Sequence, residues 1–324
     1  MSEKMKVLIA YDGSSCADAA LNDLECAGLP QEAETLILSV AEVFLPPSSP
    51  TPTFRTQVPA AVQRAWTQAT QALEEAHTLA QQARARILTS FPAWDVGAEA
   101  CADSPAWAVI KKAESWQPDI IVVGSHGRSA LGRFVLGSVS QKILTEAHCA
   151  VRVGRQRRQA DTGPLHLLIG IDGSPDAAAA VQVVAARQWP VASSVRLVTA
   201  LDARMCTALA FMRQPEETGT AARDAEASAL MSKTIDAMTG LLHTRGLTVS
   251  SVIKEGDPKH VLLEEAEQWE ANCLFVGARG LRRVERFLLG SVSAAVAARA
   301  HCSVEVIHRA GRHASLSTME GIVL

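Results

Sequence analysis

Short apolar runs alternate along the whole chain with stretches whose apolar residues recur every three or four positions. The runs at 5–12, 119–124 and 167–172 read MKVLIAYD, DIIVVG and LLIGID. Such nearly continuous runs are typical of parallel strands that helices cover on both faces. Residues 62–87 show the other pattern, a single apolar stripe that predicts one long helix. The chain therefore indicates an α/β protein.

The predicted elements come in the same order twice. In the first half, strands are expected at 5–12, 34–43, 94–101, 119–124 and 149–153, with helices at 16–28, 62–87, 104–116 and 138–147. In the second half, strands are expected at 167–172, 194–202, 247–256, 273–277 and 302–307, with helices at 175–188, around 231–242, at 257–269 and from 291. The proline-rich segment 46–59 is expected to be a loop.

The glycine-rich segments 124–140 and 277–293 indicate that the chain is a duplication. They agree at 9 of 17 positions without a gap, where about one match is expected from average composition. Both carry the spacing Gly-x2-Gly-x9-Gly-Ser after a predicted strand, and each half begins with a strand that ends in an aspartate, Asp12 or Asp172. We therefore expect two domains of one fold, each a parallel sheet built by right-handed crossovers.

The polar segment that joins the halves sets the predicted domain boundaries. Residues 154–164 read GRQRRQADTGP, with glycine and proline and no apolar pattern. We therefore expect a first domain at 1–154, a linker at 155–164, a second domain at 165–309 and a C-terminal tail at 310–324.

The repeated glycine spacing predicts a site for a nucleotide phosphate in each half. An open parallel sheet binds ligands beyond the carboxyl ends of its strands, where the strand order reverses. The loops after Asp12 and Gly124 meet there if the first and fourth strands are neighbours. A side chain at Gly124 would then block the ligand, and Gly127 allows a positive φ or a close backbone approach. Gly137 precedes a helix whose first amides are unpaired and carry the positive end of its dipole.

Two serines at the start of this helix are expected to help. Ser138 and Ser140 offer hydroxyl groups to phosphate oxygens. In the second half the same roles pass to Gly277, Gly280, Gly290, Ser291 and Ser293. The loop is not a Walker loop, since no Gly-Lys-Ser/Thr follows, nor a dinucleotide fingerprint, since it follows the fourth strand. The alternative is that these glycines merely permit a tight turn and close packing of a helix on a strand.

The charged residues near the loops leave two interpretations open. Asp12 and Asp172 either face a ribose hydroxyl or an adenine amino group, or they shape the turn and cap the next helix. The loop arginines either neutralise a triphosphate or are solvated; they are Arg128, Arg133, Arg279, Arg282, Arg283 and Arg286. More of them lie in the second half, which is therefore expected to hold a triphosphate at least as tightly. Arg279 stands where the first half has His126, which argues against a histidine general base.

This set of features resembles the universal stress protein family in its tandem, ATP-binding form, over about 1–154 and 165–309. The resemblance implies two tandem doubly wound five-stranded parallel sheets of order 3-2-1-4-5, an adenine nucleotide alpha hydrolase-like fold. Single-domain relatives form dimers across the last strand. The two halves are therefore expected to form an intramolecular pseudo-dimer, and the chains a homodimer.

The resemblance also implies ATP as the ligand, with or without Mg²⁺. Asp12 and Asp172 would face the adenosine, while Val40 and Ala200 would line the adenine pocket. The other ligand-binding residues would be Gly124, Gly127, Arg128, Gly137, Ser138, Val139 and Ser140 in the first half and Gly277, Gly280, Gly290, Ser291, Val292 and Ser293 in the second.

The sequence departs from the family pattern at two places. Alanine or serine, rather than proline, follows Cys149 and Cys302. The turn after the third strand has Gly256 in the second half but Ala102 in the first, which makes the first adenine pocket the less typical one.

Composition limits the binding partners and the cellular location that are expected for the protein. A net charge of −3 argues against a nucleic-acid-binding surface. No run approaches 18 apolar residues and the N-terminus lacks a signal-peptide pattern, so a cytoplasmic location without membrane contact is expected. The seven cysteines form no CxxC pair and are expected to be buried thiols rather than a redox or metal site.

The expected function is that of an ATP-binding regulator that responds to nucleotide during stress, with no protein partner specified. No residue is an evident general base, so at most weak ATP hydrolysis is expected. A slow ATPase or phosphotransferase that uses the same pocket is one alternative. An interaction scaffold that binds no nucleotide is the other.

Overall fold

The computed structural model describes residues 4–43, 60–127, 136–156, 163–202, 220–280 and 289–308, with the backbone alone for 220–230. The first half consists of β1 (Met5–Ala10), α1 (Ser15–Asp23), the 3-10 turn η1 (Leu24–Cys26), β2 (Ala33–Ala41), α2 (Ala60–Ser90), β3 (Asp95–Ala102), α3 (Pro105–Trp116), β4 (Ile120–Gly124), α4 (Ser138–Glu146) and β5 (Ala150–Gly154). The second half consists of β6 (His166–Gly170), α5 (Pro175–Ala186), β7 (Ser194–Leu201), α7 (Thr220–His243), β8 (Thr248–Glu255), α8 (Pro258–Gln268), β9 (Cys273–Gly277), α9 (Ser291–Arg299) and β10 (Ser303–Ile307). All the predicted helices and strands are present, whereas the predicted loop at 46–59 and the tail lie outside the described residues.

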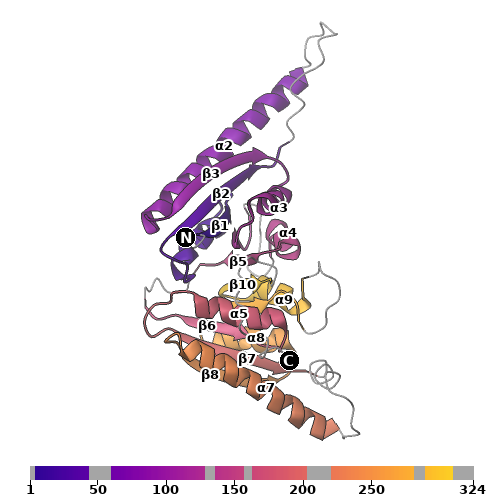
Figure 1. Ribbon diagram of the computed structural model, residues 1–324. Helices are drawn as coiled ribbons and strands as arrows, with labels where there is room; N and C mark the ends of the chain where they lie inside the picture. Colours follow the sequence, from indigo (N-terminus) through magenta and orange to yellow (C-terminus); the bar gives the residue numbers. More distant parts are fainter. Residues whose placement is uncertain are drawn as a thin grey trace.

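The ten strands of the described residues form one sheet, in the order β3-β2-β1-β4-β5-β10-β9-β6-β7-β8. Each half has the predicted order 3-2-1-4-5 with parallel pairing between its strands. The two five-stranded sheets are continuous, because β5 and β10 lie side by side and pair antiparallel where the halves meet (Figure 1). Their register relates the halves by a pseudo-twofold axis, since it pairs Val151 with Val306, Arg152 with Glu305 and Val153 with Val304.

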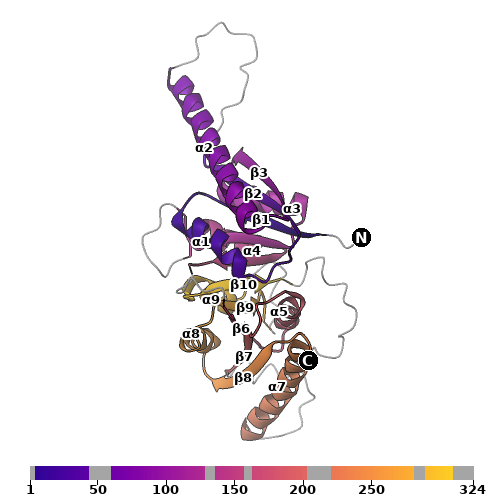
Figure 2. The ribbon, with the colours of Figure 1, turned by 90° about the vertical axis from the view of Figure 1, so that its left-hand side faces the viewer.

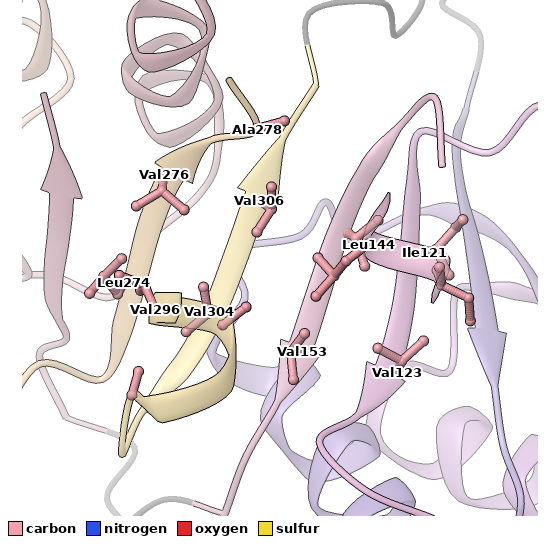
Figure 3. Close-up of a cluster of buried hydrophobic side chains, with 14 of the residues drawn as sticks. Ile121, Val123, Leu144, Val153, Leu274, Val276, Ala278, Val296, Val304 and Val306 are labelled. Atoms are coloured by element: carbon pink, nitrogen blue, oxygen red, sulfur yellow. The ribbon is translucent and has the colours of Figure 1, made fainter. Parts of the chain in front are cut away.

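Helices cover both faces of the sheet, and Figure 2 shows α2 opposite α3 and α5 opposite α8. On one face, α1 and α2 bury an apolar cluster in the first half, and α5 and α7 bury another in the second. On the opposite face, α3, α4, α8 and α9 share a single cluster that crosses the junction. Figure 3 shows Val153 of β5 in this shared cluster with Val304 and Val306 of β10, near Leu144 and Val296. The halves therefore have one continuous core on this side.

Four charged side chains are buried at the junction on the other side. Nη1 of Arg152 on β5 donates to Oε2 of Glu305 on β10 over 3.0 Å, and its Nε donates to Oδ2 of Asp23 over 2.6 Å. Arg187, which follows α5, binds both carboxylate oxygens of Glu305. Arg152, Asp23 and Glu305 are at most 2% exposed. Two cations and two anions thus form a neutral cluster, which we call the junction cluster.

In the junction cluster, attraction between opposite charges shifts the pKa of the buried groups more than burial does. Burial alone would lower the pKa of Arg152, but Asp23 and Glu305 raise it well above its usual range. Burial alone would raise the pKa of Glu305, but Arg187 and Arg152 hold it below its usual range. Arg152 and Glu305 therefore stay charged away from water.

The expectation that the cysteines are buried is met by three of the six described ones, since Cys16, Cys26 and Cys101 are half-buried. Six of the seven are described and are thiols rather than disulfides, while Cys206 lies outside the described residues. Cys149, Cys273 and Cys302 are buried, and burial raises the pKa of each thiol. In the described part of the chain, no three or more His, Cys, Asp or Glu side chains are grouped so that they could hold a metal ion. None of the described helices is long and apolar enough to cross a membrane.

Replacing Arg152 by methionine should lower the free energy of unfolding by about 3–5 kcal/mol, because Asp23 is then buried without its cation. Adding Asp23→Leu to the same chain should recover most of the loss, because Arg187 and Glu305 remain a balanced pair. Chemical denaturation followed by circular dichroism measures both variants. Lys4→Met, which removes an exposed ion pair, is the control and should change stability by less than about 1 kcal/mol. A double variant no more stable than Arg152→Met would contradict this account.

Candidate functional site

The loops after β1 and β4 meet at the carboxyl ends of these neighbouring strands, as the sequence predicts. Ser14 connects them, because its hydroxyl accepts from the N–H of Ala17 at 3.1 Å and donates to the carbonyl oxygen of His126 at 3.4 Å. Ser174 makes the same two contacts in the second half. Its hydroxyl accepts from the N–H of Ala177 and donates to the carbonyl oxygen of Arg279, both at 3.2 Å. The sequence analysis missed these two serines, although Asp-Gly-Ser follows the first strand of each half.

Asp12 and Asp172 shape the turn before each serine. Oδ1 of Asp12 accepts from the N–H of Ser14 at 3.0 Å, and Oδ1 of Asp172 accepts from the N–H of Ser174 at 2.9 Å. Gly13 and Gly173, which lie between each aspartate and its serine, have φ values of 76° and 79°, a conformation that favours glycine. The aspartates therefore have the turn-forming role that was one of the two interpretations, while the serines cap the helices.

The second carboxylate oxygen of each aspartate lies close to the middle glycine of its loop. A Cβ on Gly127 would lie 3.0 Å from Oδ2 of Asp12, and a Cβ on Gly280 would lie 2.8 Å from Oδ2 of Asp172. Neither glycine has a positive φ, so the close approach explains why glycine is needed there. Aspartate and glycine loop thus form a single site in each half.

Gly124 and Gly277 leave room for a helix. A Cβ on Gly124 would lie 2.8 Å from the backbone carbon of Cys16 at the start of α1. A Cβ on Gly277 would lie 2.7 Å from the backbone nitrogen of Ala177 at the start of α5. For these two glycines the structure supports the alternative of close helix–strand packing, and a contact with a ligand stays a prediction.

Two helices begin at the site with a glycine in the cap position. The N–H of Gly137, before α4, donates to Ser125 O at 2.8 Å, and the N–H of Gly290, before α9, donates to Ala278 O at 2.8 Å. No side chain of a described residue caps either helix, in contrast to α1 and α5. The first-turn amides of α4 and α9 therefore suit an anion, which the helix dipole also favours.

The four serines of these helix starts differ in exposure. Ser138 and Ser291 are exposed at the first position of α4 and α9. Ser140 and Ser293 are buried, and each donates to the carbonyl oxygen of the first glycine of its loop, at 2.7 Å and 2.6 Å. A hydroxyl has one hydrogen to donate, so Ser140 and Ser293 would have to break this bond in order to donate to a phosphate.

The apolar residues expected near a ligand lie at the same ends of the strands. Val40 near the end of β2 is half-buried, and Ala200 at the equivalent place in β7 is buried. Val139 and Val292, the second residues of α4 and α9, pack against the shared cluster. These four residues therefore border the site, and their contact with an adenine ring stays a prediction.

The turn after the third strand differs from the expectation. Gly256 has a φ of 140°, and its N–H donates to Leu201 O at 3.0 Å. In the first half the equivalent bond, to Ala41 O at 3.2 Å, comes from the N–H of Asp103. The expected correspondence of Gly256 with Ala102 is therefore wrong by one residue.

Different side chains lie behind the two glycine loops. In the second half, Nε of Arg279 donates to Oδ2 of the buried Asp176 at 3.0 Å. His126 and Cys16 occupy the equivalent positions of the first half, and burial, together with Arg155, lowers the pKa of His126. Asp176 thus neutralises Arg279. The other loop arginines, Arg128, Arg133, Arg282, Arg283 and Arg286, lie outside the described residues.

A buried histidine lies behind the Arg279–Asp176 pair. His308, which follows β10, is close to Asp176, Arg279 and His148, and to the backbone of Leu144 near the end of α4. Its Nε2 has no hydrogen-bond partner among the described residues. Burial, more than the neighbouring charges, lowers the pKa of His308 to about 4.

The family profile that matches the chain is that of the universal stress protein family, at residues 4–155 and 165–308. The chain belongs to this family. A universal stress protein of Mycolicibacterium smegmatis is 32% identical over 212 residues, 63% of this chain and 66% of that protein. A universal stress protein A-like protein of Arabidopsis thaliana is 39% identical over 67 residues, 21% of this chain and 38% of that protein. The chain thus spans about two thirds or less of the length of these relatives.

Solved structures confirm the predicted tandem fold of this universal stress protein. The crystal structure of a universal stress protein from Archaeoglobus fulgidus matches with a TM-score of 0.62 at 19% identity, covering 94% of this chain and 98% of that chain. A functionally unknown protein from Pseudomonas aeruginosa matches with a TM-score of 0.53 at 14% identity, covering 94% and 92%. At this identity the likeness shows the fold alone, two tandem doubly wound α/β units.

Replacing Gly277 by alanine should lower the free energy of unfolding by about 1–3 kcal/mol, because the new Cβ would overlap the backbone of α5. Gly240→Ala is the control, since nothing lies within 4 Å of a Cβ at that helical position. It should leave stability unchanged or raise it, because alanine favours a helix. Chemical denaturation compares the two variants, and equal stability would contradict the packing role of Gly277.

Lowering the pH from 6.5 to 4 should destabilise the chain partly through His308. The unfolded chain takes up this proton near pH 6.5, whereas the folded chain does so only near pH 4, so the free energy of unfolding falls as pH falls through this window. The contribution of His308 is at most about 3 kcal/mol. His308→Gln should therefore lose less stability between pH 7 and pH 4.5 than the unaltered chain does in chemical denaturation. His260→Gln, at an exposed histidine, should behave like the unaltered chain; the same behaviour of His308→Gln would contradict the argument.

Proposed function

We propose that this universal stress protein binds ATP in one or both halves and acts as a nucleotide-responsive regulator in a stress response. The observation that carries the proposal is the arrangement found at both sites: an aspartate after the first strand, a glycine in close contact with it, and a glycine-capped helix. Both sites keep this backbone arrangement although the side chains behind them differ. The spacing of the glycines is the one expected for the ATP-binding branch of the family.

The described residues fit a nucleotide. The first-turn amides of α4 and α9 would hold phosphate oxygens, with the exposed hydroxyls of Ser138 and Ser291 beside them. Val40 and Ala200 would line the adenine pockets. The aspartate of each site would accept from a ribose hydroxyl or an adenine amino group, because a carboxylate beside phosphates would repel them.

Magnesium, cellular location and chain association belong to the same proposal. Mg²⁺ would arrive with ATP, bound mainly by phosphate oxygens and water, as is usual for this ion. A cytoplasmic location and a homodimer of chains complete the proposal, and both follow from the sequence analysis alone.

Calorimetry with ATP, AMP and cyclic AMP separates the proposal from its alternatives. A scaffold that binds no nucleotide gives no heat with any of the three. An ATPase or phosphotransferase would bind ATP and also turn it over well above background, with loss of turnover in Asp12→Asn or Asp172→Asn. We favour the regulator because no residue of the sequence is an evident general base.

Replacing Gly137 and Gly290 by valine in one chain should abolish ATP binding while both domains stay folded. Both glycines have a φ of −62°, which valine tolerates. The new Cβ atoms would lie 3.3 Å from Cα of His126 and 3.1 Å from the oxygen of Ala278, so the loops would be pushed out of place. Isothermal titration calorimetry measures the binding, and circular dichroism verifies the fold.

Gly163→Val is the matched control, because a Cβ at this position meets nothing within 4 Å. It should bind ATP like the unaltered chain. Unchanged ATP affinity in the Gly137→Val/Gly290→Val chain would defeat the assignment of these sites. Mass spectrometry of the ligand that co-purifies with the protein gives an independent identification of the nucleotide.

A further inference from the structure

The residue that follows each central strand reaches from one half of the molecule into the other. Arg155 follows β5 and His308 follows β10, at equivalent positions of the duplication. Each side chain lies against the end of the last helix of the opposite half. We call these two side chains the crossing residues.

The first crossing contact ties the second site to the first. Helix α9 begins beside Gly290 at the second site. At its other end, Arg155 donates to the carbonyl oxygen of Ala297 and, over 3.3 Å, to that of Cys302. Arg155 is also near enough to His126, in the glycine loop of the first site, to lower the pKa of that histidine. A single helix and one side chain thus connect the two loops.

The second crossing contact runs in the opposite direction. Helix α4 begins beside Gly137 at the first site, and the backbone of Leu144 near its end lies close to His308. The carbonyl oxygen of Ile307, the residue before His308, accepts from the N–H of Ala278, in the loop of the second site, at 2.8 Å. The oxygen of Ala278 in turn accepts from the N–H of Gly290 at 2.8 Å. This chain of contacts therefore reaches the helix cap of the second site.

We propose that ATP bound at one site changes the ATP affinity of the other, through α4 with His308 and α9 with Arg155. This inference rests on the proposed function. Each helix is a rigid element of nine residues whose first turn would have to settle on a phosphate. Because the interior is close-packed, a shift of the helix start is carried to the end of the helix and to the crossing residue that lies there. The coupling is the same in both directions, as thermodynamic linkage requires.

Isothermal titration calorimetry with ATP tests the coupling in the full chain. The Gly137→Val and Gly290→Val chains each retain one site and give its affinity in isolation. In the unaltered chain, the second ATP molecule should bind with an affinity that differs at least about 5-fold from the isolated affinity of the same site. An isotherm equal to the sum of the two single-site isotherms, or binding at one site only, would overturn the proposal.

Removing the crossing residues tests the route. The same three titrations in an Arg155→Ala/His308→Ala background should give sites that are independent within about twofold. Arg245→Ala/His260→Ala, which changes an exposed arginine and an exposed histidine, is the control and should keep the coupling. A coupling that persists without the crossing residues would overturn the route.

Two further results complete the test. Should the double variant fail to fold, His308→Leu replaces it and should weaken the coupling at least twofold, whereas His308→Gln, which keeps a polar N–H group beside the backbone of Leu144, should keep it. Equal coupling in these two chains would overturn the role of His308. Absence of heat from ATP in every chain would refute the proposed function together with this inference, whereas two independent sites would refute the coupling alone.

Discussion

The antiparallel pairing of β5 with β10 is the contact on which the rest of the molecule depends. It joins two five-stranded sheets into one, gives the helices of one face a common core, and brings the crossing residues within reach of the opposite half. At its centre Arg152 faces Glu305, at positions that the duplication made equivalent. Each half contributes one cation and one anion to the junction cluster, Arg152 with Asp23 and Arg187 with Glu305, and Arg152 also binds Glu305 across the junction. Each of the two central charges is thus neutralised both within its own half and by the other half.

Away from the junction, the duplicated sites kept their backbone and changed their charges. The turn at the aspartate, the capping serine and the close contacts of the glycines recur in both halves. Behind the loops, however, Cys16 and His126 in one half correspond to Asp176 and Arg279 in the other. Both members of the pair differ together, because the buried Asp176 without the cation of Arg279 would be costly. The two sites thus share a shape and differ in electrostatics.

The order of the elements and the meeting of the two loops could be predicted, because apolar periodicity and glycine spacing are local signals. The junction cluster could not, since Arg152 and Glu305 lie in short strands and are 153 residues apart. The packing role of Gly124 could not be predicted either. The spacing of glycines does not show that the backbone of α1, at Cys16, lies where a side chain of residue 124 would be. The apolar stripe predicted α2 but not that the helix extends beyond the sheet at its start, where Val62 is 36% exposed (Figures 1 and 2).

The continuous sheet has a consequence for how chains can associate. With β5 and β10 paired within the chain, β3 and β8 are the two outer strands of the sheet among the described residues, and both retain backbone groups for the addition of another strand. A chain that associated through either strand would extend the sheet at the end of a half farthest from the junction. Such an interface and the one that joins the halves would share no strand, so each can be weakened independently.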